Sequence, residues 1–298
     1  VEINEIQTQL NNARVSIIAI KLININSSLD IVEEALNLLG LLLRFGNIHV
    51  QKTLFDWLQD PMNSFNFFSY VRELLHETGQ KINNKLVQES DNVNLNVVKK
   101  SNLYYDSVQT LFMPINIKQV EGLSNVDQVD SLERTLYMDD EAKYFRVPQK
   151  ILLLLQLFCE NCYENFQHFI REQDYYVEDK DKVSSINIVY EVGNFLIGLL
   201  NVNQIIYTDR LALSLISQSF LTLSDFCLGP CDMNQVLLGT RRTLLKSLNN
   251  LFKYEMKFSI NERLNTERNE VFCGAITFLK SLINPLNLQE IGEVLLEE

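Results

Sequence analysis

The stretch Ile151–Gln173, ILLLLQLFCENCYENFQHFIREQ, decides the fold class of this chain. Plotted at 100° per residue, its apolar side chains gather on one broad side, which predicts an amphipathic helix of about six turns. The apolar side carries Ile151, Leu155, Phe158, Cys162, Phe166 and Phe169, and the polar side carries Gln156, Glu160, Glu164, Gln167 and Arg171. Such a wide apolar side requires neighbours on more than one flank. We therefore expect a layered or stacked α-helical body.

The composition of the whole chain favours the same fold class. Its 298 residues are 46% hydrophobic, enough to bury a sizeable core, and they include only 10 Gly and 5 Pro. Such a small number of chain breakers does not suit a many-turned β-sandwich, and the abundant Leu, Asn, Glu, Gln and Lys favour long helices. We predict an all-α protein.

Apolar periodicity and stop signals divide the chain into about ten helices. Ser27 or Ser28 is expected to cap a helix that ends at Gly46, and Pro148 suits the first turn of the helix containing 151–173. The predicted helices cover residues 1–26, 29–45, 49–58, 64–86, 103–113, 151–173, 186–201, 209–227, 232–254, 266–283 and 288–296, with a weaker signal at 129–145.

These helices alternate with short turns in loose units of roughly 40 residues, the period of armadillo and HEAT repeats. The predicted architecture is therefore an armadillo/HEAT-like α-solenoid. We divide it into N-terminal helical hairpins (1–82), a polar acidic linker with one or two helices (83–147) and a helical core (148–298).

Charge and cysteine content restrict the partners and the compartment. The net charge of −12 argues against nucleic acid and anionic membranes as main partners, because both repel an acidic protein. Five cysteines without a small-scaffold spacing predict reduced thiols in the cytosol. The longest apolar runs fall short of the ~20 residues that a bilayer requires, so we expect no transmembrane segment. The first residue is Val1, and we expect the chain to be a piece of a longer protein.

The cysteine pairs Cys159-x-x-Cys162 and Cys227-x-x-x-Cys231 superficially offer four sulfur ligands for zinc. The first pair lies inside a Leu-rich helix without a glycine knuckle, and cysteine is readily buried. Packing in the core is therefore the favoured interpretation.

No constellation for catalysis stands out. Cys159 and His168, nine residues apart on one predicted helix, would point in opposite directions, which does not suit a nucleophile and its base. The chain also lacks both G-x-G-x-x-G and the P-loop pattern. We do not expect an enzyme.

Acidic residues provide the remaining candidate site. Glu160 and Glu164 share a polar stripe, and a second stripe of Gln218, Thr222 and Asp225 should pack near it. Two carboxylates from neighbouring helices can begin a calcium site, but calcium takes six to eight oxygen ligands. From the residues alone, a solvated helix face remains the favoured interpretation.

Two stretches resemble the signature sequences of the RIH-associated domain, the region shared by inositol trisphosphate receptors and ryanodine receptors. They are Leu154–Arg171, LLQLFCENCYENFQHFIR, and Phe220–Gln235, FLTLSDFCLGPCDMNQ. Gly46–Gln51, GNIHVQ, with the Phe-rich hairpin that follows, is similar to the start of the same region. Together the resemblance covers about two thirds of the chain, and the linker carries little of it.

The resemblance implies a cytosolic, armadillo-like block of a tetrameric intracellular calcium-release channel, on the cytoplasmic side of the endoplasmic reticulum or a related store. Such a block lies between the N-terminal ligand-binding part and the pore, and its partners are other domains and subunits of the same channel. In the family, an activating calcium ion is held by two acidic residues that match Glu160 and Asp225 here. A further oxygen ligand comes from near the pore, which this chain does not contain.

Three positions depart from the family pattern. The family has His where Cys162 stands, Gln where Leu228 stands and Glu where Asp225 stands. The departures remove an imidazole and an amide and shorten one ligand by a methylene, so we expect calcium to bind more weakly or not at all. The competing hypothesis is a soluble helical-repeat adaptor that binds a partner protein without calcium dependence.

Overall fold

The computed structural model describes residues 3–92, 145–173, 185–201, 210–229, 231–255 and 265–283. Every regular element in these residues is an α-helix and none is a β-strand, which confirms the all-α prediction. The helices predicted at 103–113 and 288–296, and most of the predicted linker with its 129–145 helix, lie outside the described residues.

The N-terminal part comprises α1 (Ile3–Asn12), α2 (Val15–Lys21), α3 (Leu29–Leu43), α4 (Ile48–Leu58) and α5 (Pro61–Asn92). The prediction of one helix over 1–26 is wrong, because Arg14 adopts a left-handed conformation with φ of 64° and separates α1 from α2. Asn11 stabilises this corner, since its side-chain amide donates to Thr53 Oγ1 in α4 at 2.8 Å.

The local signals around α3 are confirmed. The Ser28 side chain accepts a hydrogen bond from the backbone N–H of Ile31 and caps the helix. Gly46 follows the helix end with φ of 66°, a conformation that glycine adopts without a steric penalty. Asn47 then caps α4, and its side-chain oxygen accepts from the backbone N–H of His49 at 3.1 Å.

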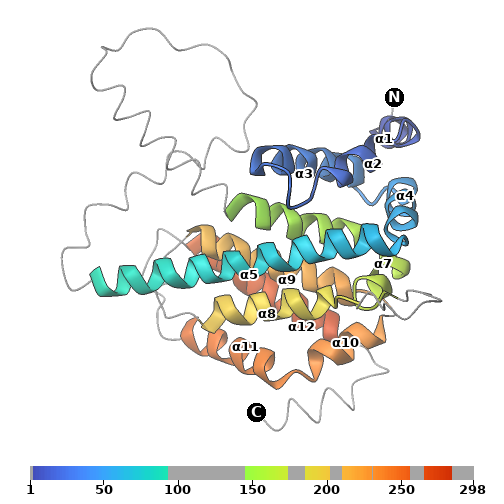
Figure 1. Ribbon diagram of the computed structural model, residues 1–298. Helices are drawn as coiled ribbons and strands as arrows, with labels where there is room; N and C mark the ends of the chain where they lie inside the picture. Colours follow the sequence, from blue (N-terminus) through green and yellow to red (C-terminus); the bar gives the residue numbers. More distant parts are fainter. Residues whose placement is uncertain are drawn as a thin grey trace, which may run out of the picture.

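Helix α5 is longer than the prediction of 64–86. It begins at Pro61, where the Asp60 side chain accepts hydrogen bonds from the N–H groups of Met62 and Asn63 at 3.0 Å each. It continues to Asn92 and runs across the molecule (Figure 1). The tight connection at Asp60-Pro61 ends α4 as predicted, whereas α5 already begins at Pro61, before the predicted start at residue 64.

The C-terminal part begins with a helix over residues 145–159, called here the central helix. It is followed by α7 (Glu164–Phe169), α8 (Ile188–Asn201), α9 (Arg210–Cys227), α10 (Asp232–Gly239), α11 (Arg242–Glu255) and α12 (Asn265–Leu282). The prediction of one helix over 232–254 is wrong. A corner at Thr240 and Arg241 divides it, and the Arg241 guanidinium lies 4.2 Å from the centre of the Tyr190 ring in α8.

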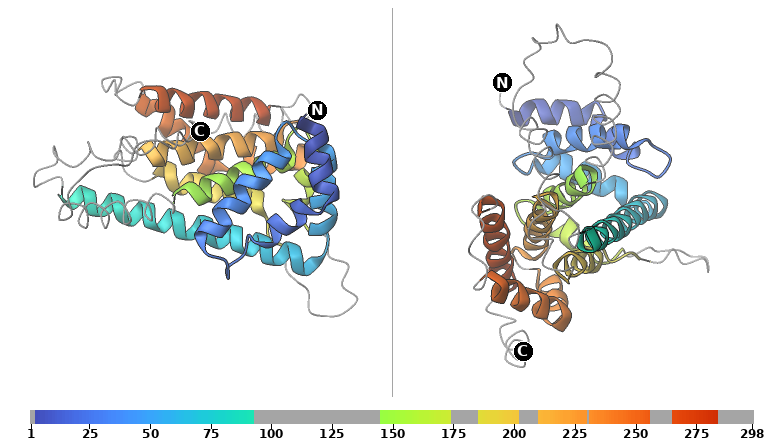
Figure 2. Two further views of the ribbon diagram at one scale, coloured as in Figure 1. Left: turned by 90° about the horizontal axis from the view of Figure 1, so that it is seen from above. Right: turned by 90° about the vertical axis from the view of Figure 1, so that its left-hand side faces the viewer.

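The central helix is surrounded by other helices. Helices α1–α4 form an upper layer, and the central helix lies beneath α3 with α5 and α9 on its two sides (Figures 1 and 2). Helices α8, α10, α11 and α12 complete the lower part of the molecule. The expectation of neighbours on more than one flank is therefore confirmed.

One hydrophobic core runs through these layers and includes Phe158 of the central helix and Phe278 of α12. An ion-pair cluster joins the upper layer to the central helix. Glu33 Oε1 in α3 lies 2.6 Å from Lys150 Nζ and 3.2 Å from Arg146 Nε. Because the Glu33 side chain is only 11% exposed, this cluster is less screened by solvent than an ordinary surface pair.

The prediction of one helix over 151–173 is wrong. The central helix ends at residue 159 and α7 begins at Glu164, because Asn161 and Cys162 adopt left-handed conformations with φ of 60° and 57°. Phe158 and Phe166 still lie on one apolar side, with their rings stacked 4.4 Å apart. The connection between the two helices, residues 160–163, is called here the central turn.

Candidate functional site

The central turn is held against the end of α3 by a side-chain amide. Asn161 Nδ2 donates to the backbone oxygens of Phe45 at 3.3 Å and Gly46 at 3.4 Å. The approach is close: a Cβ atom on Gly46 would collide with the Asn161 side chain and lie 3.5 Å from Glu160 Cγ. Only glycine fits this position, which explains why two turns distant in sequence meet here.

Gln51 of α4 caps the end of the central helix. Its side-chain Nε2 donates to the backbone oxygens of Leu157 at 3.0 Å, Phe158 at 3.3 Å and Glu160 at 3.0 Å. The last carbonyl groups of a helix have no partner within the helix, so a buried end needs such donors. Gln51 is 1% exposed, and it therefore fixes the backbone that carries Glu160.

Gln167 of α7 caps the C-terminal end of α9 in the same way. Its side-chain Nε2 donates to the backbone oxygens of Asp225 and Leu228, each at 2.7 Å. Asn234 of α10 adds donations to the backbone oxygens of Gln167 and Phe226 at 2.9 and 2.8 Å. The C-terminal ends of the central helix and α9 are thus both held by buried amide side chains.

The two predicted polar stripes pack together. Gln218 Nε2 in α9 donates to Gln156 Oε1 in the central helix at 2.8 Å. One turn further along α9, Thr222 Oγ1 donates to the backbone oxygen of Leu152 at 2.9 Å. The expectation that these stripes lie side by side is confirmed, and it places Asp225 near the central turn.

Asp225 lies close enough to Glu160 to influence the ionisation of the Glu160 carboxyl group. Burial raises the pKa of the Glu160 carboxyl, the negative charge of Asp225 raises it further, and a hydrogen bond from the Gly46 backbone opposes the shift. Burial also raises the pKa of Asp225, against a hydrogen bond from the Gln156 side chain. Glu164 is separate, because its side chain is exposed and lies 3.3 Å from His168 Nε2.

Three features favour a cation between the two carboxyl groups. Glu160 Oε2 is buried and has no hydrogen-bond partner. Gln167 Oε1, on the side chain that donates to the Asp225 backbone oxygen, is also buried without a hydrogen-bond partner. Glu160 and Asp225 also lie at helix C-termini, where the helix dipole disfavours negative charge and attracts positive charge.

The donor set fits calcium only in part. Carboxylate and amide oxygens are the ligands that calcium prefers, but it takes about six to eight of them. Within the described ranges there is no group of three or more His, Cys, Asp and Glu residues that could hold a metal ion. Glu160 and Asp225 would therefore supply one side of a calcium site, which other oxygens must complete.

Two departures from the family pattern lie beside this site. A Cβ atom on Gly229 would lie 3.1 Å from Cys162 Sγ, so the Cys162 side chain packs on the turn after α9. The Leu228 side chain is 43% exposed in that turn. These positions place a thiol and an aliphatic group where the resemblance implies a ring nitrogen and an amide.

The expected packing in the core is confirmed for three of the four paired cysteines, and Cys162 is only partly buried. Cys159, Cys227 and Cys231 are buried, and all five cysteines of the chain are free thiols. Burial raises the pKa of Cys159 and Cys227 well above the usual value, and neighbouring Asp225 and thiol groups add to the shift at Cys159. Burial of these thiols agrees with the interpretation that they pack in the core.

The rejected Cys159 and His168 dyad has no support either, although the argument from one continuous helix no longer applies. His168 lies in α7, beside Glu164 and Arg171, on the other side of the central turn from Cys159. Cys159 is fully buried, with a raised pKa that keeps its thiol protonated.

No described helix is long and apolar enough to cross a membrane.

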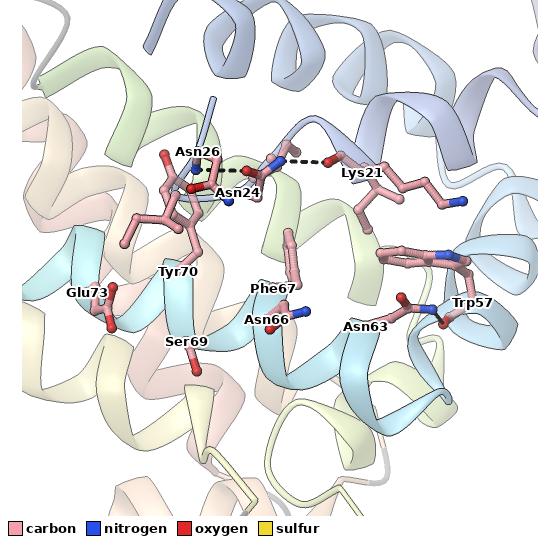
Figure 3. Close-up of a pocket in the computed structure, with 13 residues that line it drawn as sticks. Lys21, Asn24, Asn26, Trp57, Asn63, Asn66, Phe67, Ser69, Tyr70 and Glu73 are labelled. Atoms are coloured by element: carbon pink, nitrogen blue, oxygen red, sulfur yellow. Dashed lines mark hydrogen bonds between the residues drawn. The ribbon is translucent and has the colours of Figure 1, made fainter. Parts of the chain in front are cut away.

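A pocket of about 590 Å³ lies elsewhere, between the segment after α2 and helices α4 and α5 (Figure 3). Its lining includes the faces of Trp57, Phe67 and Tyr70. Lys21 and Glu73 lie toward opposite ends of the pocket and form no acid–base pair (Figure 3). Burial and the charge of Glu77 raise the pKa of Tyr70 to about 12, so its hydroxyl stays protonated at neutral pH.

Comparison with known proteins identifies relatives of this chain. Residues 142–252 match the family described as RyR and IP3R Homology associated. The chain is 26% identical over 287 residues to inositol 1,4,5-trisphosphate receptor itr-1 of Caenorhabditis elegans. That match covers 85% of this chain and 10% of the receptor, so the chain spans about a tenth of the length of this curated relative. Both signature stretches, Leu154–Arg171 and Phe220–Gln235, lie within the residues that match the family.

Proposed function

On the match of residues 142–252 to the RyR and IP3R Homology associated family and the similarity to an inositol trisphosphate receptor, we propose that this chain is a cytosolic segment of an intracellular calcium-release channel. The segment couples ligand binding in one part of the channel to gating of the pore. Its role is structural and regulatory, without enzymatic activity. The parent protein is a homotetramer on the endoplasmic reticulum or a related store, and the partners of this segment are other domains and subunits of that channel.

Glu160 and Asp225 contribute part of an activating calcium site in this proposal. The observation that carries it is the pairing of two carboxyl groups at the C-terminal ends of two helices, with Glu160 Oε2 buried and unpaired. Burial raises the pKa of both groups, the charge of Asp225 adds to the shift at Glu160, and a bound cation would favour the charged form of each carboxyl group. Calcium would supply the positive charge, and Gln51 and Gln167 would fix the backbones that carry its ligands.

The incomplete coordination suits a role in coupling. An ion held partly by this segment and partly by another domain binds most tightly when the two are correctly placed. Its differential affinity therefore shifts the population between closed and open channels. Because the central turn and the turn after α9 are fixed by buried amides, a displacement of the ion would be passed to the central helix and α9.

The finer architecture follows the same proposal. The helices form part of an armadillo/HEAT-like α-solenoid, in which residues 1–82 supply N-terminal hairpins, 83–147 an acidic linker and 148–298 the RIH-associated core. The stacking of the upper layer on the central helix supports this architecture (Figure 2). The single hydrophobic core indicates that the first and last of these segments fold together.

The test is calcium activation of the full-length channel, measured as calcium release or single-channel opening. Glu160→Gln and Asp225→Asn should each shift activation to higher calcium concentrations without loss of the folded channel. Glu164→Gln is the matched control, since Glu164 lies in the same stretch but pairs only with His168 among the described residues. Unchanged calcium sensitivity in both site variants would refute the assignment of the site.

The alternative is a soluble helical-repeat adaptor that binds a partner protein without calcium dependence. The exposed apolar surface on α2 and α3 is the observation that favours it. The two functions differ in a simple measurement on the native protein: membrane-embedded tetramers with calcium-dependent opening support the channel. A soluble complex whose composition is the same with calcium or with chelator supports the adaptor.

A further inference from the structure

The pocket of about 590 Å³ beside α4 and α5 has the size of a ligand site, because such sites usually enclose about 300–1,000 Å³. Aromatic rings from two helices line it: Trp57 of α4, and Phe67 and Tyr70 of α5. Phe67 is buried, whereas Trp57 and Tyr70 are only partly buried. The pocket therefore offers aromatic surface that a ligand can contact (Figure 3).

Several side chains that line the pocket carry hydrogen-bond donors without a partner. The indole N–H of Trp57, the side-chain amide of Asn66 and the hydroxyl of Tyr70 form no hydrogen bond with any other described residue. Asn63 is different, because its Nδ2 donates to the backbone oxygen of Trp57 at 3.1 Å. An indole nitrogen can only donate. Such a lining suits a ligand that presents acceptors and few donors of its own.

The pocket is elongated along α5. Asn63, Asn66, Tyr70 and Glu73 all line it and recur at the spacing of one helix face. The step from residue 63 to residue 73 corresponds to about 15 Å at about 1.5 Å per residue. A polyproline II helix rises about 3.1 Å per residue, so about five of its residues match this length. Proline residues supply carbonyl acceptors and lack N–H donors, which agrees with the free donors of the pocket.

Two charged groups at the pocket give the ligand a direction. Lys21 and Glu73 lie toward opposite ends and form no ion pair with each other or with another described residue (Figure 3). Glu73 suits an arginine that flanks the prolines, and Lys21 suits an acidic residue at the other end. A nucleotide fits less well, because its phosphates would meet a single lysine on a chain with a net charge of −12.

We propose that this pocket binds a proline-rich segment of a partner protein, in the polyproline II conformation, with arginine on one side of the prolines and an acidic residue on the other. Aromatic-lined grooves suit such segments because a preformed, rigid helix loses little entropy on binding. This chain and a second copy of it cannot supply the segment, since even its closest prolines, Pro114 and Pro148, are far apart in sequence. None of the lining residues belongs to the candidate calcium site.

The probe for the test is a fluorescein-labelled peptide with arginine at one end, aspartate at the other and about five prolines between them. Both chain directions are synthesised. Binding to the whole 298-residue chain is measured by fluorescence anisotropy. The control peptide keeps both charges but has glycine and serine in place of the prolines. The tighter of the two proline peptides should bind at least about fivefold more tightly than the control, a difference of about 1 kcal/mol.

The variants Asn66→Ala and Glu73→Lys should each weaken binding of the proline peptide about fivefold or more. Glu270→Lys is the matched control, because Glu270 is also exposed but lies in α12 and does not line the pocket. It should leave the affinity unchanged. A peptide with glutamate in place of arginine should reverse the order and bind Glu73→Lys more tightly than the wild-type chain. Loss of folding cannot produce this reversal, and circular dichroism verifies the fold of each variant.

Four outcomes would overturn the proposal. Equal binding of the proline and glycine–serine peptides would show that the charges alone attract the probe. An equal loss in Glu270→Lys would show non-specific electrostatic attraction. Absence of saturable binding of the proline peptides up to about 1 mM would exclude a proline-rich ligand. Displacement of the bound peptide by ADP, with the same dependence on Glu73→Lys and Asn66→Ala, would make a nucleotide the occupant.

Discussion

Replacement of Gln51 by methionine tests whether the buried amide holds the central turn. Methionine has nearly the same length and fits a similar volume, but it cannot donate hydrogen bonds. The change removes the donations from Nε2 to the carbonyl oxygens of Leu157, Phe158 and Glu160, which lie 3.0–3.3 Å away. Gln51 is 1% exposed, so water cannot readily replace the amide.

The magnitude follows from the number of bonds that the amide can make. Its two hydrogens serve three carbonyl groups, which corresponds to about two full hydrogen bonds. Each bond contributes about 1 kcal/mol, and a buried carbonyl left without a partner costs about 1–3 kcal/mol. We therefore expect Gln51→Met to lower the free energy of unfolding by about 2–4 kcal/mol.

The assay is urea denaturation of the chain followed by circular dichroism, with Gln59→Met as the control. Gln59 is exposed at the end of the same helix, so its replacement should change stability by no more than about 0.5 kcal/mol. In the full-length channel, Gln51→Met should also shift calcium activation to higher concentrations, because Gln51 fixes the Glu160 backbone. A stability loss no larger than that of the control would refute the reasoning.

Three further predictions concern the same region. Gly46→Ala should lower the unfolding free energy by about 1–2 kcal/mol or more in urea denaturation, since φ is 66° and the new methyl group would collide with the central turn. The control is Gly40→Ala, which has open space in α3 and should raise the unfolding free energy by about 0.5–1 kcal/mol. Glu33→Gln should cost about 1–3 kcal/mol in the same assay, because two partly buried cations lose their counter-charge, and a loss abolished by 1 M salt would contradict this. Burial raises the pKa of the Glu160 and Asp225 carboxyl groups, so the calcium-free folded chain keeps these protons to a higher pH than the unfolded chain does. The folded chain therefore loses stability as the pH rises through the folded pKa values. Glu160→Gln should then melt at a higher temperature than the wild type at pH 7, with the difference shrinking in more acidic buffer, and a reversed difference would exclude the carboxyl coupling.

Signals confined to a few neighbouring residues were predictable from the sequence. Ser28 caps α3 and Gly46 follows its end because each acts through backbone groups within a few residues. The contact between the polar stripes that contain Gln156 and Gln218 was also predictable, because polar side chains on two largely apolar helices that pack together tend to pair with each other. Helix type and approximate position therefore follow from local chemistry and periodicity.

The break at the central turn was not predictable in the same way. The 151–173 stretch has continuous helical periodicity, and no glycine or proline interrupts it. The hydrogen-bond partners of the central turn are distant in sequence, because Gln51 and Phe45 precede Asn161 by more than 100 residues. Tertiary hydrogen bonds thus override a helical pattern that local propensity favours. Gln51 gave no signal of its role, because a single glutamine in an apolar helix is usually assigned to the surface.

The candidate site shows the same division. Composition and spacing left Glu160 and Asp225 as two acidic residues on surface stripes, and only the family resemblance linked them to one ion. The structure adds the physical reason for their proximity, because the ends of the central helix and α9 are both fixed by amides from other helices. The buried Glu160 Oε2, which has no hydrogen-bond partner, is the observation that favours a cation site over a solvated helix face.

The rigidity of this junction bears directly on how calcium would act through it. The turns after α3, the central helix and α9 each contain residues in the left-handed conformation, at Gly46, Asn161 and Gly229 among them, and pack closely on one another. A flexible loop would absorb the movement of a bound ion by changing its own dihedral angles. Turns fixed by close packing and buried amides cannot do so without losing several hydrogen bonds, each worth about 1 kcal/mol. An ion shared with a second domain would therefore move the helices that end at these turns, and weakening either amide cap should reduce the coupling before it reduces the affinity for calcium.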